Sequence, residues 1–165
     1  MESRVKLLGH PIHPMLIVFP LGLLATAVVF DILYVLTRNA DLATFSFFAL
    51  IAGVIGGLLA AVFGLLDWLK IPKETRARRI GAIHGVGNVV VVGLFALSLL
   101  ARWSNHAYLP DTLPLVFGVL GAVLALFTAW LGGELVYRLR VAVDDDANLN
   151  ASNSISREGI AQVRT

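Results

Sequence analysis

The stretch ATFSFFALIAGVIGGLLAAVFGLLDWL, residues 43–69, decides the fold class because it is apolar almost throughout and contains a single charged residue, Asp67. An α-helix rises about 1.5 Å per residue, so a helix over this run is longer than the hydrocarbon core of a bilayer, which is about 30 Å thick. Three further apolar runs of sufficient length cover residues 15–36, 80–101 and 113–136. The sequence therefore predicts an all-α integral membrane protein with four transmembrane helices.

The composition supports this class and excludes several others. Hydrophobic residues make up 58% of the chain and charged residues 15%, and the mean hydropathy is +0.82, well above the range of soluble domains. Cysteine is absent, which excludes disulfides, thiolate catalysis and cysteine-ligated metals within the chain. The basic residues lie beside the apolar runs, where they orient helices, so the expected partner is the lipid bilayer and not a nucleic acid.

The distribution of basic residues predicts the topology. Most lie before the first run, between the second and third, or after the fourth: Arg4, Lys6, Lys70, Lys73, Arg76, Arg78, Arg79, Arg138 and Arg140. The other two connections carry only Arg38 and Arg102. Because positive loops stay in the cytoplasm, we expect both termini there, and the short connections favour an antiparallel four-helix bundle over residues 1–140. Residues 141–165 have no apolar period, so we expect a disordered cytoplasmic tail.

Small residues recur at four-residue spacing in two of the predicted helices. They are Gly53, Gly57 and Ala61 in the second helix and Gly121, Ala125, Ala129 and Gly133 in the fourth. Such stripes let helix backbones approach closely in lipid, so we interpret them as packing faces. The same faces permit a homodimer without requiring one.

One layer of polar residues lies near the predicted cytoplasmic ends of all four helices. Its members are His10, His13, Asp67, His84, Asn88 and Glu134. Ionisable groups in a membrane are costly and therefore mark functional sites by default. The positive ends of the first and third helices disfavour imidazolium, which leaves a histidine nitrogen free to bind a metal.

A second polar level lies toward the other side of the membrane, at Asp31 and Arg102. His13 and Asp31 are about five helical turns apart and so share one face of the first helix. On the third helix, His84 and Arg102 lie on one stripe of three- and four-residue steps. If the two stripes face each other, Asp31 and Arg102 form a structural ion pair.

The first functional hypothesis is a b-type haem protein of the electron-transfer class. Haem iron would lie between His13 or His10 and His84, in a layer that also contains Asn88, with its propionates toward Arg76 and Arg79. A single haem on this side would exchange electrons with a quinone or a partner protein.

Two alternatives remain open on the sequence. The first is a non-haem zinc or iron site, or a proton relay, built from His13, His84, Asp67 and Glu134, with His10 beside them. The second is a structural membrane partner that has no cofactor and no chemistry of its own.

Five separated motifs resemble those of one bacterial membrane family. They are GHPIHPML at 9–16, GLLDWLKIP at 64–72, TRARR at 75–79, HGVGN at 84–88 and LGGELVYR at 131–138. Together they resemble the family known as domain of unknown function 2231. The resemblance implies a four-helix protein of the bacterial inner membrane without an established activity, and some relatives are joined to a Rieske-type iron–sulfur domain.

The polar residues of the family motifs are nearly the same as the residues of the predicted cytoplasmic layer. Those positions are His10, His13, Asp67, Arg79, His84, Asn88 and Glu134. One departure is Val18, where the resemblance implies a histidine in many relatives. If that histidine binds a cofactor in them, the site of this chain is altered.

Overall fold

The computed structural model describes residues 1–103 and 108–155. Within these residues, four helical stretches are long and apolar enough to cross a membrane: Ile12–Thr37, Ala40–Lys70, Arg76–Trp103 and Thr112–Arg138. The prediction of a membrane protein with four spanning helices is therefore confirmed. Each helix extends past its predicted apolar run, because the helices continue through the polar residues that flank the runs.

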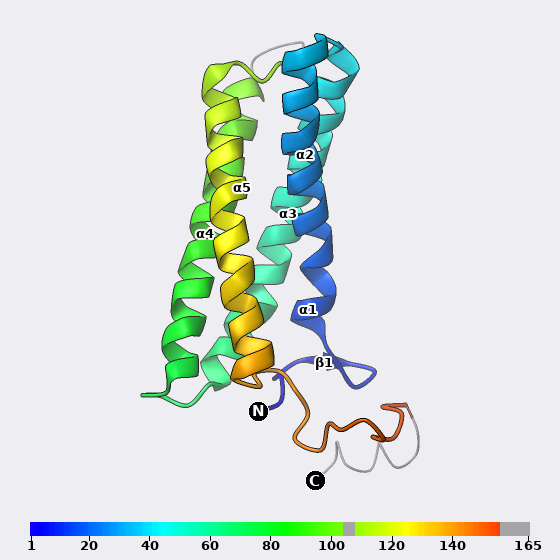
Figure 1. The fold of residues 1–165 in the computed structure, drawn as a ribbon, viewed down its shortest axis with the longest axis vertical. Helices are drawn as coiled ribbons and strands as arrows, with labels where there is room; N and C mark the ends of the chain where they lie inside the picture. The colour runs from blue at the N-terminus through cyan, green and yellow to red at the C-terminus, as the bar shows by residue number, and fades with distance from the viewer. Residues whose placement is uncertain (104–107, 156–165) are drawn as a thin grey trace.

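The described elements follow one another along the chain as a short hairpin and a series of helices (Figure 1). They are β1 (Lys6–Leu7), β2 (His10–Pro11), α1 (Ile12–Leu16), α2 (Val18–Thr37), α3 (Ala40–Lys70), α4 (Arg76–Trp103), α5 (Thr112–Gly133) and the π-helical turn η1 (Glu134–Arg138). The hairpin is antiparallel, with Leu7 opposite His10. Gly9 at its turn has φ +84°, a conformation that glycine adopts without strain.

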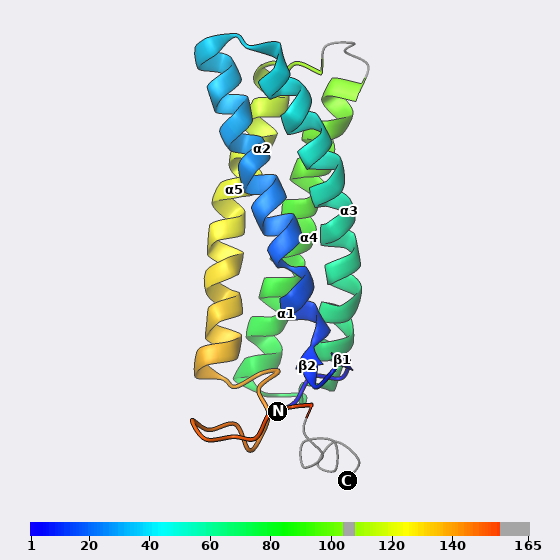
Figure 2. The ribbon, with the colours of Figure 1, turned by 90° about the vertical axis from the view of Figure 1, so that its right-hand side faces the viewer.

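The helices form a bundle in which α2 packs mainly on α3 and α4 packs mainly on α5. The two pairs meet where α3 contacts α4 and where α2 contacts α5 (Figures 1 and 2). The N-terminal segment and the end of α5 lie at one end of the bundle (Figure 1), as four spans of alternating direction require. We call this the terminal end, and we call the opposite end, which holds the α2–α3 and α4–α5 connections, the distal end.

The first span is interrupted between α1 and α2. Proline has no amide hydrogen, so Pro20 cannot donate to the carbonyl of Leu16 four residues earlier. α1 accordingly ends at Leu16 and α2 begins at Val18. The chain continues through Ile17 with helical dihedral angles, so the interruption leaves one membrane span.

The apolar core lies in the middle of the bundle and draws on α2, α3 and α4. Its buried members are Leu24, Ala27, Val28, Leu50, Val91 and Phe95. A Cβ atom at Gly53 would lie 2.6 Å from the Leu24 side chain, and one at Gly121 would lie 2.9 Å from Phe95. These two glycines therefore serve as packing positions, as their spacing predicts. Large apolar side chains cover the exterior of the bundle, where they contact lipid.

The tail differs from its prediction. Val141 is buried and packs with Ile71 and Leu135 at the terminal end. Residues up to 155 form turns and contact the N-terminal segment, whereas the remaining predicted tail, 156–165, lies outside the described residues. The structured part therefore extends past residue 140, because an apolar side chain at 141 finds a site between two helix ends.

Candidate functional site

His13 lies in α1 and is held by the neighbouring helix α3. Its Nδ1 is 2.9 Å from the carbonyl oxygen of Ala60. A carbonyl can only accept, so Nδ1 is the donor, and the neutral ring then keeps an unprotonated Nε2. The ring packs on Gly64, where a Cβ atom would lie 2.8 Å from Cε1 and 3.0 Å from Nδ1 of His13. The absence of a side chain at residue 64 therefore makes room for this imidazole.

His84 lies in α4 and repeats this arrangement on α5. Its Nδ1 is 2.9 Å from the carbonyl oxygen of Thr128, so here too Nδ1 donates and Nε2 keeps its lone pair. A Cβ atom at Gly132 would lie 3.2 Å from Cε1 of His84. Both histidines are thus oriented through a main-chain carbonyl of the adjacent helix and lie close to a glycine.

Asn88 connects His84 to Thr128. Its amide nitrogen donates to the main-chain oxygen of His84 at 2.9 Å, and its amide oxygen accepts from the Thr128 hydroxyl at 3.1 Å. The same amide nitrogen is 3.4 Å from Nδ1 and 3.3 Å from Nε2 of His84. Both ring nitrogens of His84 therefore lie within hydrogen-bonding distance of the Asn88 amide.

The two imidazoles are half-buried. They come from different helix pairs, His13 from the α1–α3 side and His84 from α4–α5. The structure thus places two histidines toward the terminal end of the bundle, each with Nδ1 at a main-chain carbonyl of a neighbouring helix.

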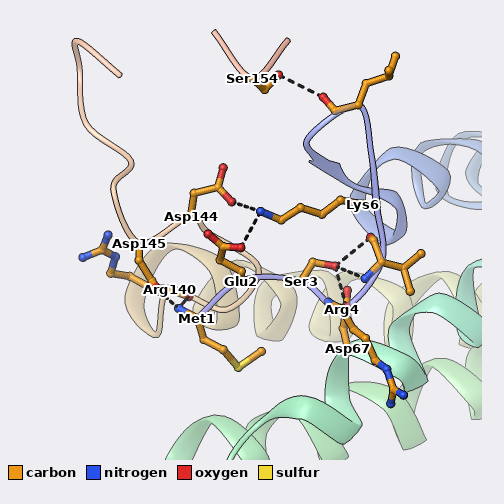
Figure 3. Close-up of polar contacts among 12 residues, drawn as sticks. Met1, Glu2, Ser3, Arg4, Lys6, Asp67, Arg140, Asp144, Asp145 and Ser154 are labelled. Atoms are coloured by element: carbon orange, nitrogen blue, oxygen red, sulfur yellow. Dashed lines mark hydrogen bonds and ion pairs between the residues drawn. The ribbon is translucent and has the colours of Figure 1, made fainter. Parts of the chain in front are cut away.

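Asp67, at the end of α3, is 7% exposed and is held by the N-terminal segment (Figure 3). Its Oδ1 accepts from the Ser3 hydroxyl at 2.7 Å and from the main-chain N–H of Arg4 at 2.7 Å. Sequence reasoning missed Ser3 and Arg4 as its partners. A lone serine upstream of the first apolar run carries no periodic signal that could have revealed this contact.

Lys6 ties the N-terminal segment to residues after the last helix. Its ammonium group donates to Glu2 and to Asp144 (Figure 3). Burial alone would lower the pKa of Lys6, but the hydrogen bonds and charges of Asp144 and Glu2 outweigh it and raise the pKa above 10.5. Nearby, the Ser154 hydroxyl donates to the main-chain oxygen of Leu8. We call the contacts of Ser3, Arg4 and Lys6 the terminal clasp.

The remaining predicted ligands are dispersed. Glu134 forms an ion pair with Arg76 at 2.9 Å, and Arg79 and His10 are exposed. Over residues 1–103 and 108–155, no group of three or more His, Asp or Glu side chains is placed to hold a metal ion. The metal site expected from His13, His84, Asp67 and Glu134 therefore stays a prediction; in this structure Asp67 contacts Ser3 and Arg4, and Glu134 pairs with Arg76.

At the distal end the structure brings Asp31 and Arg102 together. Arg102 donates from Nη1 to Oδ1 at 2.9 Å and from Nη2 to Oδ2 at 2.7 Å, and both residues are 1% exposed. Ser98 and Ser46 accept further hydrogen bonds from the guanidinium group, and Ser98 donates to the Pro114 carbonyl. All four spans therefore contribute to one buried polar cluster.

Position 18, where the family resemblance implies a histidine, lies on the exterior. The Val18 side chain is 60% exposed. A histidine at this position would therefore lie on the outer surface of α2, near the interruption at Ile17.

Comparison with known proteins gives one match. The model of a family described as "Predicted membrane protein (DUF2231)" matches residues 9–145. No curated protein and no solved structure matches the chain. The matched range includes both oriented histidines and Asp67, but it begins after Ser3 and Arg4.

Proposed function

This chain belongs to the DUF2231 family of predicted membrane proteins, and from this premise we propose that it is a haem-b-binding redox protein whose axial ligands are His13 and His84. Haem iron, when bound, supplies reversible one-electron transfer. The family description assigns no activity, so the proposal rests on the two imidazoles.

The observation that carries the proposal is the shared orientation of the two rings. Each Nδ1 donates to a main-chain carbonyl 2.9 Å away on a neighbouring helix. Metal-binding histidines typically donate their second ring N–H in this way, which sets the tautomer and the direction of the ligating nitrogen. This contact supports the proposal, because it holds each ring in place and, in the neutral ring, assigns the proton to Nδ1 and leaves Nε2 as the nitrogen that would bind iron.

The number of available ligands favours haem over zinc or non-haem iron. A protein-only metal site needs three or four side chains, and the described residues contain no such group. A porphyrin brings four equatorial nitrogens and needs only two axial ligands. Two imidazoles from different helix pairs match that requirement in number.

The surrounding charges suggest how haem propionates would be held. Arg76 is already paired with Glu134. Arg79, in the first turns of α4, is exposed and has no ion pair among the described residues. Arg79 is therefore the better placed of the two to bind a propionate. The electron partner in this proposal is a quinone or a redox protein that reaches the terminal end.

The test is an absorption spectrum of the full chain, purified in mild detergent after haem is supplied during expression, before and after dithionite. We expect a reduced α band of b-type haem that is lost in His13→Ala and in His84→Ala. His10→Ala is the matched control, because His10 is an exposed histidine of the same segment, and it should retain the band.

Two outcomes would contradict the proposal. A colourless wild-type protein would favour a structural membrane partner without a cofactor. A band that survives both His13→Ala and His84→Ala would place the haem elsewhere.

A further inference from the structure

A groove at the distal end lies between the end of α2 and the beginning of α5. It encloses a cavity of about 300 Å³. Tyr34 and Arg38 line it on the α2 side, and Asp111, Leu115 and Val116 line it on the α5 side. The groove is far from both histidines, which lie toward the terminal end.

The packing of the bundle explains why this seam is open. α2 packs mainly on α3, and α5 packs mainly on α4. Arg38 ends α2 in a left-handed conformation with φ +59°, which turns the chain toward α3 and away from α5. The seam between the two helix pairs therefore lacks a covering segment among the described residues at this level.

The rim of the groove carries one charge of each sign. Arg38 is exposed, and its guanidinium carbon lies 5.8 Å from the centre of the Tyr34 ring. Asp111 is exposed and caps no main-chain amide with its side chain. Neither has an ion-pair partner within residues 1–103 and 108–155. The groove thus has an exposed cation and an exposed carboxylate on its rim and a lining of both polar and apolar groups.

We propose that this groove binds phosphatidylethanolamine, a phospholipid whose headgroup carries one phosphate and one primary ammonium. Arg38 is suited to the phosphate, because guanidinium and phosphate oxygens form charge-assisted hydrogen bonds. Asp111 accepts from the ammonium group, and Leu115 and Val116 contact the first part of an acyl chain. Helix ends lie at the membrane interface, where lipid headgroups are found.

Charge complementarity selects this lipid over other phospholipids. Phosphatidylglycerol has a phosphate but no cation for Asp111. Phosphatidylcholine has a cation, but its quaternary nitrogen has no hydrogen to donate. Of these three headgroups, only ethanolamine supplies both a phosphate for Arg38 and an N–H donor for Asp111.

The experiment measures lipid retained by the purified full chain. Protein in mild detergent is mixed with equal amounts of phosphatidylethanolamine, phosphatidylglycerol and phosphatidylcholine, and bound lipid is counted by native mass spectrometry. We expect ethanolamine lipid to exceed glycerol lipid by about fivefold, the effect of one partly exposed charge pair. Asp111→Asn should abolish that preference, whereas Arg38→Gln should reduce retention of all three lipids and Arg38→Lys should restore part of it.

Matched controls lie at the other end of the molecule. Arg138→Gln and Asp146→Asn make the same chemical changes at exposed residues of the terminal end and should leave the preference intact. Equal retention of the three lipids by the wild type would overturn the proposal. So would a preference that the controls remove as well as Asp111→Asn does, since it would then reflect overall charge and not the groove.

Discussion

The two ends of the bundle hold ionisable side chains in opposite ways. At the distal end, Asp31 and Arg102 satisfy each other through two hydrogen bonds. At the terminal end, His13 and His84 each bring Nδ1 to a main-chain carbonyl, and Nε2 of His84 lies 3.3 Å from the amide nitrogen of Asn88. A polar group in a membrane marks a function only when part of its bonding capacity is left for a ligand.

The difference follows from the chemistry of the groups. A carboxylate and a guanidinium are complementary in charge and geometry, so Asp31 and Arg102 satisfy each other's hydrogen-bonding groups. Among the buried side-chain atoms of the described residues, only Nε of Arg102 has no partner. An imidazole has two nitrogens on opposite sides of a ring, and one main-chain carbonyl can engage only one of them. The distal pair is therefore satisfied internally, whereas the second nitrogen of each terminal histidine is the atom to which we propose that haem iron binds.

The largest effect should come from opening the distal ion pair. Arg102→Leu leaves Asp31 buried without its partner, and we expect it to lower the free energy of unfolding by about 3–5 kcal/mol. Thermal unfolding in detergent, followed by tryptophan fluorescence, measures this loss. The double variant Asp31→Leu/Arg102→Leu should be more stable than Arg102→Leu alone. If both variants lost equal stability, an unpaired buried charge would not be the cause.

A smaller effect should come from filling the space beside His13. A methyl group at residue 64 would lie 2.8 Å from the His13 ring, so Gly64→Ala must displace it at a cost of about 1–3 kcal/mol. The same unfolding measurement detects the cost, and any haem band should weaken with it. Gly93→Ala is the matched control, because nothing lies within 4 Å of its added Cβ. Equal behaviour of the two variants would show that the ring of His13 is not confined by residue 64.

The terminal clasp should respond locally to Ser3→Ala. This change removes one of two hydrogen bonds to Oδ1 of Asp67, worth about 1 kcal/mol. We expect faster hydrogen exchange at the Arg4 amide without a measurable shift in global unfolding. Ser154→Ala, which removes an exposed hydroxyl contact to Leu8, should leave the Arg4 amide unchanged. Unaltered exchange in Ser3→Ala would mean that the clasp is held by other contacts.

The smallest effect should come from Lys6. The folded-state pKa of Lys6 is raised above 10.5. Its contribution to the free energy of unfolding is therefore complete below pH 10.5 and is lost as the pH rises through the higher folded-state pKa. Lys6→Gln should cost less than about 1 kcal/mol, as partly exposed ion pairs do. Spin-label distances between the N-terminal segment and residues 146–150 measure the opening. The distances should lengthen above pH 10.5 in the wild type and in Lys73→Gln, and Lys6→Gln should have longer distances at neutral pH. A pH response retained in Lys6→Gln would assign it to another group.

The sequence predicts the helices well because few main-chain conformations are possible for a segment that crosses a bilayer. Main-chain groups in lipid must be paired within the segment, so an apolar run of sufficient length becomes a helix. The spacing of Asp31 from His13 and of Arg102 from His84 also predicts the Asp31–Arg102 pair. A long apolar helix keeps its angular register over many turns, so each spacing assigns two residues to one helix face.

The sequence predicts the polar layer less well because depth does not specify partners. Asp67 and Glu134 lie at the level of the histidines, yet Asp67 binds Ser3 and the Arg4 amide, and Glu134 binds Arg76. The stabilising role of Val141 in the predicted tail was missed for a related reason. A single apolar residue has no period, and only the packed helix ends create its site.

The sequence by itself determined that this chain spans a membrane four times and that its costly polar residues gather at two levels. Hydrophobic length and helical period are local properties, and they can be read along the chain. Only the tertiary structure decided which hydrogen-bond partner each of those residues has. The partners, such as the carbonyls of Ala60 and Thr128, come from other helices.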